Sequence, residues 1–193
     1  GGGPGGYVCA VRSAQSGLKT ALVEQKDLGG VCLNLGCIPS KALLRNAELA
    51  HLLRTNALSY GIQMDNLSLD YGAAFKRSRQ VSQRLTKGVG FLMKKHCVSV
   101  FNGRGTLSGP TEVQVALADG STQALNASNI VLATGAHPTV VPGMEPDGER
   151  ILDYSHAILL EQLPKSALII GGGAIGVEFA TIRSAYGVEV DLV

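Results

Sequence analysis

Two cysteines, Cys32 and Cys37, restrict the local backbone more than any other feature of the chain. They lie in the segment Gly29–Leu44, which reads Gly-Gly-Val-Cys-Leu-Asn-Leu-Gly-Cys-Ile-Pro-Ser-Lys-Ala-Leu-Leu and continues as a helical pattern. On an ideal α-helix, residues five positions apart have Cα atoms about 8.6 Å apart, whereas a relaxed disulfide requires less than about 7 Å. Cys32 and Cys37 can therefore form a disulfide only if the helix is distorted between them.

Gly36 and Pro39 would supply the distortion. Glycine has a wide range of backbone dihedral angles, and proline lacks the N–H that would bond back to residue 35. A strained disulfide is easily reduced, which suits a redox-active dithiol. A structural disulfide and a zinc site are the alternatives. The first is typical of small secreted domains, and the second needs further Cys or His residues at ligand spacing, which the nearby sequence lacks.

Glycine-rich motifs stand on both sides of this segment. Gly1, Gly3 and Gly6 form Gly-x-Gly-x-x-Gly, which a predicted helix over Tyr7–Gln15 and a predicted strand over Leu18–Glu24 follow. This order, ending in an acid, is typical of a dinucleotide site, where the helix N-terminus attracts a pyrophosphate and the acid binds ribose hydroxyls. A glycine-rich loop or tag without a ligand is the alternative, because no strand precedes the motif in this sequence.

The second glycine motif has the preceding strand that the first one lacks. A predicted strand over Ala167–Ile170 leads directly into Gly171–Gly176, and predicted helix Val177–Tyr186 follows, with Gly187 as its cap. Val188–Val193 is expected to begin the next strand. The residue that distinguishes NAD from NADP would lie beyond Val193, so the sequence does not separate the two.

The remaining elements predict a mixed α/β chain. Two long helices are expected over Pro39–Ala57 and Tyr71–His96, and the basic residues of the second are expected to form a solvated face. From Val98 the spacing of apolar residues changes to the alternation typical of strands, and Asp119-Gly120 predicts a hairpin turn. The predicted strands are 98–101, 113–117, 123–125 and 130–133, followed by a linker over 138–147 and a short helix over 152–161.

The composition argues against a nucleic-acid-binding protein and against a membrane-spanning one. Apolar residues make up 45% of the chain, which is enough for a core, and a net charge of +2 without a basic block does not indicate nucleic-acid binding. No apolar run reaches the ~20 residues of a membrane span, and no export signal is present. Together with four cysteines, this predicts a reducing, cytoplasmic location. Cys9 and Cys97 are predicted to be buried small apolar residues.

The cysteine segment between two dinucleotide motifs resembles that of the pyridine nucleotide–disulfide oxidoreductases, and its Cys-Leu-Asn and Ile-Pro-Ser-Lys details resemble the dihydrolipoamide dehydrogenases among them. The resemblance extends from Gly1 to Glu178. It implies an α/β fold with a Rossmann-like three-layer FAD-binding domain and a small antiparallel sheet over 1–143, without its first strand. The start of a second Rossmann-like, NAD(P)-binding domain would follow over 150–193, so the chain is expected to be an N-terminal fragment.

The resemblance also implies roles for individual residues. Cys32 would be the interchange thiol, Cys37 the thiol beside the flavin, and Lys41 would lie near flavin N5. The non-covalent FAD site would comprise Gly1, Gly3, Gly6, Glu24, Gly30, Cys32, Cys37, Lys41, Gly105, Ala133, Thr134 and Gly135. The NAD site would comprise Gly171, Gly172, Gly173, Ala174, Ile175, Gly176, Val177 and Glu178. No metal site is implied, and no catalytic role is implied for His51, His96, His137 or His156.

The implied activity is that of a flavin-dependent dithiol–disulfide oxidoreductase, which oxidises protein-bound dihydrolipoamide and passes electrons through Cys32–Cys37 and FAD to NAD⁺. A glutathione- or mercury-type NADPH-dependent reductase is one alternative, and a non-catalytic dinucleotide-binding flavoprotein is another. The implied partners are a second copy in the full-length protein and the lipoyl-bearing acyltransferase subunit of a 2-oxo acid dehydrogenase complex, with no nucleic acid or membrane. The acid–base His-Glu pair would come from a C-terminal domain, so the fragment alone is expected to be inactive.

Overall fold

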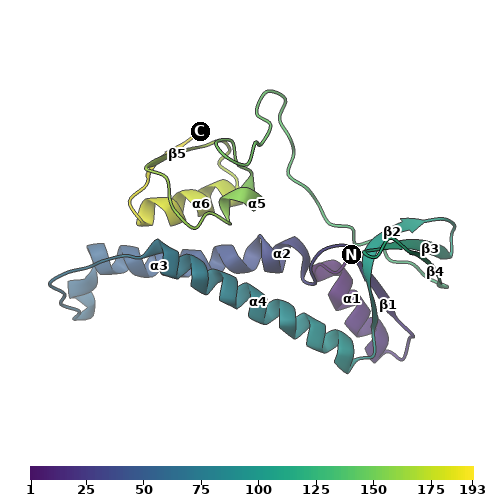
Figure 1. Cartoon of the computed structure of the whole chain (residues 1–193). Helices are drawn as coiled ribbons and strands as arrows, with labels where there is room; N and C mark the ends of the chain where they lie inside the picture. Colours follow the sequence, from purple (N-terminus) through teal and green to yellow (C-terminus); the bar gives the residue numbers. More distant parts are fainter. The chain divides into compact units, whose positions relative to one another are not determined.

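The computed structural model describes all 193 residues, and these divide into two compact units. Unit 1 comprises Gly1–Asn34 and Gln83–His137, and unit 2 comprises Leu35–Ser82 and Pro138–Val193. Each unit is therefore built from segments that lie far apart in the sequence, as the colours of Figure 1 show. The long helix α4 (Tyr71–Lys95) contributes residues to both units. None of the helices has the length and apolar character needed to cross a membrane.

Unit 1 contains a mixed sheet in which one strand changes partner along its length. Its elements are α1 (Pro4–Gln15), β1 (Ala21–Glu24), α2 (Gly30–Asn34), β2 (Ser99–Leu107), β3 (Glu112–Leu117) and β4 (Thr122–Asn126). The strand order is β1-β2-β3-β4 (Figure 1). Residues 99–102 of β2 pair in parallel with β1, and residues 103–107 pair antiparallel with β3. Gly103 stands at the change, where a Cβ would collide with the carbonyl oxygen of Ala116.

The predicted hairpin is confirmed. β3 and β4 pair antiparallel, and the turn between them contains Asp119-Gly120. Gly120 has φ +84°, which is the left-handed region that favours glycine. The Asp119 carboxylate accepts a hydrogen bond from the Ser121 N–H at 2.9 Å, so the side chain closes the turn locally.

Two predictions about unit 1 are wrong. Ile130–Ala133 is not a strand, and Val131 and Leu132 are each 66% exposed. The apolar run suits a buried strand, but β1 pairs only with β2, and no strand pairs with 130–133. Cys97 is exposed with φ +55°, because it follows the C-terminus of α4 and the next residue, Val98, occupies the buried position. Cys9 is only half-buried, on α1.

Unit 2 contains two long helices and a second strand–helix–strand motif. Its elements are α3 (Cys37–Thr55), the 3₁₀ turn η1 (Ala57–Tyr60), the first part of α4, α5 (Tyr154–Ala157), β5 (Ser166–Ile169), α6 (Ala174–Ala185) and β6 (Glu189–Leu192). β5 and β6 pair in parallel across α6, as expected for a nucleotide-binding unit. Gly187 has φ +88° directly after α6, which confirms the predicted cap.

The core of unit 2 lies where α3, α4, α5 and α6 meet. Leu43, Ile158 and Ile182 are each at most 1% exposed and form one apolar cluster with Ala74. Beside it, the rings of Tyr71 and Tyr186 pack edge to face with centroids 5.2 Å apart. Burial raises the pKa of Tyr71. This cluster joins the helix that begins at Cys37 to the helix of the second glycine motif.

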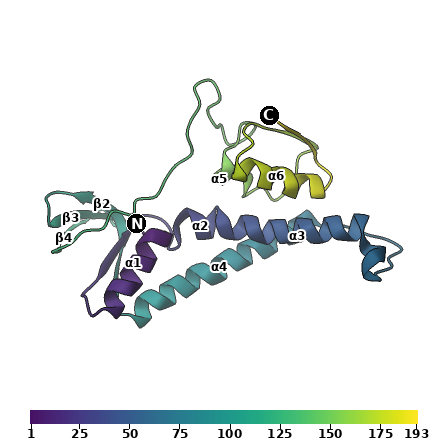
Figure 2. The ribbon, with the colours of Figure 1, turned by 180° about the vertical axis from the view of Figure 1, so that it is seen from behind.

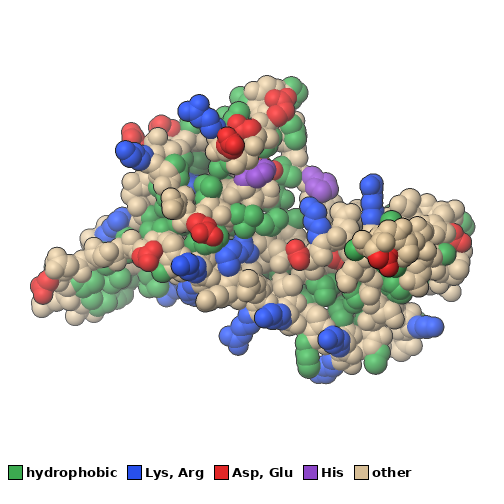
Figure 3. Space-filling model, viewed as in Figure 1, with side chains coloured by type: hydrophobic (Ala, Val, Ile, Leu, Met, Phe, Trp, Pro, Cys, Tyr) green, Lys and Arg blue, Asp and Glu red, His purple; other side chains and the backbone are tan.

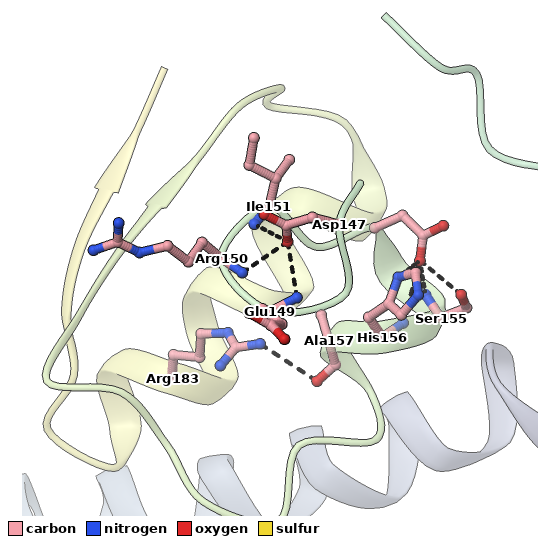
Figure 4. Close-up of polar contacts among 9 residues, drawn as sticks. Asp147, Glu149, Arg150, Ile151, Ser155, His156, Ala157 and Arg183 are labelled. Atoms are coloured by element: carbon pink, nitrogen blue, oxygen red, sulfur yellow. Dashed lines mark hydrogen bonds and ion pairs between the residues drawn. The ribbon is translucent and has the colours of Figure 1, made fainter. Parts of the chain in front are cut away.

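The helix predicted over residues 152–161 is much shorter than expected. α5 begins where it does because the Asp153 carboxylate accepts hydrogen bonds from the N–H groups of Ser155 and His156 at 2.8 and 3.2 Å. At its other end, Arg183 donates to the Ala157 carbonyl at 3.4 Å (Figure 4). Ile158, the residue that follows α5, is fully buried in the core of unit 2.

The basic face of α4 is confirmed. Lys76, Arg77, Arg84 and Lys87 are exposed, and Figure 3 shows basic side chains at the surface along this helix. Arg79 is the exception, since it is partly buried and burial lowers its pKa. Buried Ala74, Phe75, Val89 and Met93 mark the opposite, packed face.

Candidate functional site

The backbone is interrupted between the two cysteines, as their spacing requires. α2 ends at Asn34, α3 begins at Cys37, and Gly36 has φ −125° and ψ −112°, outside the helical region. Cys32 and Cys37 are disulfide-bonded, whereas Cys9 and Cys97 are the free cysteines. The predicted break is therefore at Gly36. Pro39 is not part of it but lies in the first turn of α3, where a missing N–H is tolerated.

The two cysteines have different environments. Cys37 is the first residue of α3 and is exposed, whereas Cys32 lies within α2 and is partly buried. A helix N-terminus stabilises negative charge, which favours a thiolate. The two sulfurs are therefore chemically unequal, although they belong to one short segment.

Asn34, which sequence reasoning did not single out, stabilises α2. Its side-chain amide donates to the carbonyl oxygens of Leu28 and Gly30 at 3.1 and 2.9 Å, and its Oδ1 accepts from Thr86 Oγ1 at 3.1 Å. Asn34 thus closes the turn around Cys32 and ties it to α4. The tripeptide Cys-Leu-Asn is the sequence signal that could have identified this residue.

The first glycine motif forms a cradle lined by backbone. A Cβ at Gly6 would collide with the Gly1 carbonyl, and a Cβ at Gly1 would collide with the Ala133 carbonyl. At Gly5 it would lie 3.7 Å from the Ala133 side chain. The first motif thus lies beside Ala133 and Thr134, two residues that the resemblance assigned to the same site. A Cβ is therefore excluded at Gly1 and Gly6, and α1 begins beside them with its free N–H groups.

Glu24 and the start of the cysteine segment both contact this cradle. Glu24, at the end of β1, accepts hydrogen bonds from the N–H groups of Gly2 and Lys26 at 2.6 and 2.7 Å. Each carboxylate oxygen retains a second lone pair for a further donor. Gly30 has φ +57°, and a Cβ there would lie 2.7 Å from the Cα of Gly3. The helix that carries Cys32 therefore begins in direct backbone contact with the first glycine motif.

In unit 2, the second glycine motif is tied to the helix that begins at Cys37. Lys41, one turn along α3, forms an ion pair with Glu178 of α6. Near the other ends of the two helices, Arg54 donates to the Ala185 carbonyl at 2.7 Å. Residues 137 positions apart in the chain thus meet, which no local pattern could have indicated.

The loop of the second motif is open at its centre. A Cβ at Gly172 or Gly173 would meet nothing within 4 Å, whereas a Cβ at Gly176 would collide with the Gly171 carbonyl. Gly171 has φ +110° and donates to the Val193 carbonyl at 2.7 Å. α6 begins at Ala174 with Gly173 as its N-cap, so its first N–H groups face an uncrowded loop.

The other predicted site residues lie in β2, after the sheet of unit 1 and at the start of α6. Gly105 lies in β2, where a Cβ would be 3.3 Å from the side chains of Val23 and Val113. Thr134 and Gly135 are exposed, and Gly135 has φ +83°. Ala174 and Ile175 are exposed at the start of α6, and Val177 is 45% exposed. Among the histidines, His51, His137 and His156 are exposed and His96 is half-buried.

These features define a class of protein. Two glycine loop–helix–strand motifs, the second also preceded by a strand, and a disulfide at a helix start are typical of dithiol–disulfide oxidoreductases that use dinucleotides. The family model described as pyridine nucleotide-disulphide oxidoreductase matches residues 1–193. The chain therefore belongs to this family, whose members are oxidoreductases that use FAD and NAD.

The most similar relatives include two dihydrolipoyl dehydrogenases, from Chlorobaculum tepidum and Mycobacterium tuberculosis. Each is 48% identical over 193 residues, which is 100% of this chain and 41% of the relative. The crystal structure of LpdA from M. tuberculosis matches with a TM-score of 0.87 at 28% identity, over 100% of this chain and 43% of that one. A Cu(II) complex of the HOCl-induced flavoprotein disulfide reductase RclA from Escherichia coli matches with a TM-score of 0.83 at 27% sequence identity. The match covers 100% of this chain and 40% of that one. The predicted Rossmann-like α/β fold is thereby confirmed.

Proposed function

We propose that the natural protein containing this chain is an NAD-dependent dihydrolipoyl dehydrogenase. The chain spans about two fifths of the length of its curated relatives, 41% in the first of them, so substrate and activity are inferred for the whole protein. The observation that carries the proposal is the Cys32–Cys37 disulfide at the break between α2 and α3. It lies in a chain 48% identical to dihydrolipoyl dehydrogenases.

FAD fits the first glycine motif. Gly1, Gly3 and Gly6 precede or begin α1, whose N-terminal N–H groups suit a pyrophosphate, and Glu24 has lone pairs for the ribose hydroxyls. We assign the same cofactor to Gly30, Cys32, Cys37, Lys41, Gly105, Ala133, Thr134 and Gly135. When bound, FAD would carry electrons between the nicotinamide and the disulfide.

NAD fits the second glycine motif. The exposed N–H groups at the start of α6 suit a second pyrophosphate, and the open loop at Gly172 and Gly173 admits it. We assign this ligand to Gly171, Gly172, Gly173, Ala174, Ile175, Gly176, Val177 and Glu178. We also propose that the FAD- and NAD(P)-binding domains span 1–143 and 150–193.

The chain's own residues perform the thiol exchange. A substrate thiolate attacks Cys32 Sγ, the Cys32–Cys37 bond breaks, and Cys37 leaves as a thiolate that the N-terminus of α3 stabilises. The second substrate thiolate then attacks the substrate sulfur bound to Cys32. This releases Cys32 as a thiol and the substrate as a cyclic disulfide, while the two electrons remain on Cys32 and Cys37.

The test compares Cys32→Ser with Cys37→Ser in the flavin-loaded natural protein. Cys32→Ser should abolish dithiol turnover but keep a thiolate beside the flavin, visible as long-wavelength charge-transfer absorbance. Cys37→Ser should lose both, and NADH should still reduce the flavin in either variant. If both variants keep lipoamide turnover, the dithiol is not the catalyst. If glutathione disulfide rather than lipoamide is turned over, the activity belongs to the alternative reductase type.

We further propose that the natural protein is a cytoplasmic homodimer that serves the lipoyl-bearing acyltransferase of a 2-oxo acid dehydrogenase complex. The similarity to dihydrolipoyl dehydrogenases supports this assignment. Co-purification of such an acyltransferase with the natural protein would test it, and a monomer that binds no lipoyl domain would contradict it.

A further inference from the structure

The helix of the second glycine motif is tied to the cysteine helix near both ends. α3 and α6 are in contact and lie side by side in Figure 1 and Figure 2. Lys41 pairs with Glu178 at one end, and Arg54 donates to the Ala185 carbonyl at the other. Between these ties, Leu43 and Ile182 are both 1% exposed and belong to the same apolar cluster. Both helices run in the same direction between the two ties.

Three carbonyl oxygens at the C-terminus of α6 accept hydrogen bonds from different donors. The Arg183 carbonyl accepts from the N–H groups of Tyr186 and Val188, and the Ser184 carbonyl accepts from the N–H of Gly187. The Ala185 carbonyl, one residue further along, accepts from Arg54 of α3. The last carbonyls of a helix have no partner within it, and a cation is favourable there. A side chain from another helix thus contributes to the cap of α6.

The tie at the other end is weak by itself. The Lys41 side chain is 62% exposed, and exposed ion pairs contribute little to stability because water screens them. The apolar packing of Leu43 and Ile182 holds the middle of α6, and the two polar ties act nearer its ends. α6 has 12 residues, about 18 Å of stiff helix, so a small movement at its C-terminus is transmitted to its N-terminus.

We propose that Arg54 is a positioning residue for the nucleotide site at the opposite end of α6. By holding the Ala185 carbonyl, it fixes α6 on the cysteine helix, so that the N–H groups after Gly173 are presented to the pyrophosphate of a pyridine nucleotide. Arg54 itself touches no ligand. This inference rests on the proposed function, because it assumes that the second motif binds a pyridine nucleotide.

The chain offers a matched control on the same helix. Arg45 also lies on α3 and is exposed, but it pairs with Glu48 of its own helix at 2.6 Å. Arg54→Met and Arg45→Met therefore remove the same side-chain type from the same element. Arg54→Lys retains a donor that can reach a carbonyl, and Arg54→Glu places a negative charge beside it.

The experiment measures two half-reactions of the flavin-loaded natural protein by stopped flow. Arg54→Met should raise the KM for NADH in flavin reduction about threefold, as expected for loss of a cation at a helix C-terminus, and leave dithiol-driven reduction unchanged. Arg54→Lys should restore the KM, Arg54→Glu should raise it further, and Arg45→Met should match the wild type. A merely structural role would instead lower the melting temperature without separating the two half-reactions.

Several results would overturn the inference. One is an Arg54→Met variant that behaves as Arg45→Met does, and another is equal slowing of both half-reactions. Failure of the proposed function is distinct, since the wild-type protein would then show no NADH-dependent flavin reduction at all.

Discussion

At the scale of single residues, backbone approach rather than side-chain chemistry restricts the first glycine motif most strongly. Gly30 illustrates this, because it combines φ +57° with a position where a Cβ would lie 2.7 Å from the Cα of Gly3. Both effects disfavour any other residue, and the second involves backbone, which moves less readily than a flexible side chain. The contact also places the start of α2 against the proposed FAD cradle.

Gly30→Ala should therefore destabilise the protein by about 2–5 kcal/mol, through positive-φ strain and overpacking together. Gly17 is the matched control in unit 1, since its φ is +84° and a Cβ there would meet nothing within 4 Å. Gly17→Ala should cost only about 1–2 kcal/mol, from strain alone. Urea denaturation measures both, and flavin retention should fall only for Gly30→Ala. Equal losses of stability would contradict the close approach.

At the scale of elements, short segments depend on carboxylates that cap backbone N–H groups. The loop before α5 is closed by Asp147, whose Oδ1 accepts from the N–H groups of Glu149, Arg150 and Ile151 at 2.8, 2.8 and 2.9 Å (Figure 4). These bonds, from Glu149 first and then Ile151 and Arg150, lower the pKa of Asp147 below its usual 3.8. The ionised carboxylate is thus the form that holds the loop together.

The pH dependence of this loop follows from the sign of that shift. Because the folded-state pKa is the lower one, the stabilisation is fully present above pH 3.8 and is lost as the pH falls through the folded-state value. The amide resonance of Ile151 should therefore titrate below pH 3.8, as followed by NMR. In Asp147→Asn, which keeps an acceptor but cannot ionise, that step should disappear. A titration midpoint above pH 3.8 would show that the hydrogen bonds to the Asp147 carboxylate do not form in solution.

The helices of the chain were largely predictable at this scale. α3, α4 and α6 each begin or end within a few residues of the predicted limits, because an apolar period of three to four residues and glycine or proline at the ends are local signals. The break at Gly36 was also predicted, because a disulfide between Cys32 and Cys37 requires a distorted helix and glycine permits the distortion. The length of α5 was overestimated, since the helix covers only Tyr154–Ala157.

At the scale of the whole molecule, each unit depends on its own interior. In unit 2, Leu43 is 1% exposed and joins residues of α4, α5 and α6 in one cluster. Removing a buried leucine side chain leaves a cavity that the surroundings fill only in part.

Leu43→Ala should thus lower the free energy of unfolding by about 2–5 kcal/mol. Leu49→Ala on the same helix is the control, because Leu49 is 42% exposed and should change stability by less than about 1 kcal/mol. Calorimetry or urea denaturation of both variants measures the difference. Similar losses for the two leucines would argue against a unit 2 core centred on Leu43.

The sequence by itself determined the order of motifs in this protein: glycine loop, cysteine segment, helices, hairpin and second glycine loop. It did so because glycine stereochemistry, cysteine spacing and apolar period act over a few residues. Only the tertiary structure decided that Lys41 meets Glu178, that Ala133 closes the cradle of Gly1 and Gly6, and that Ile130–Ala133 is not a strand. These outcomes depend on which distant segments pack together and on whether a strand finds a hydrogen-bonding neighbour, and neither condition is encoded in the segment itself.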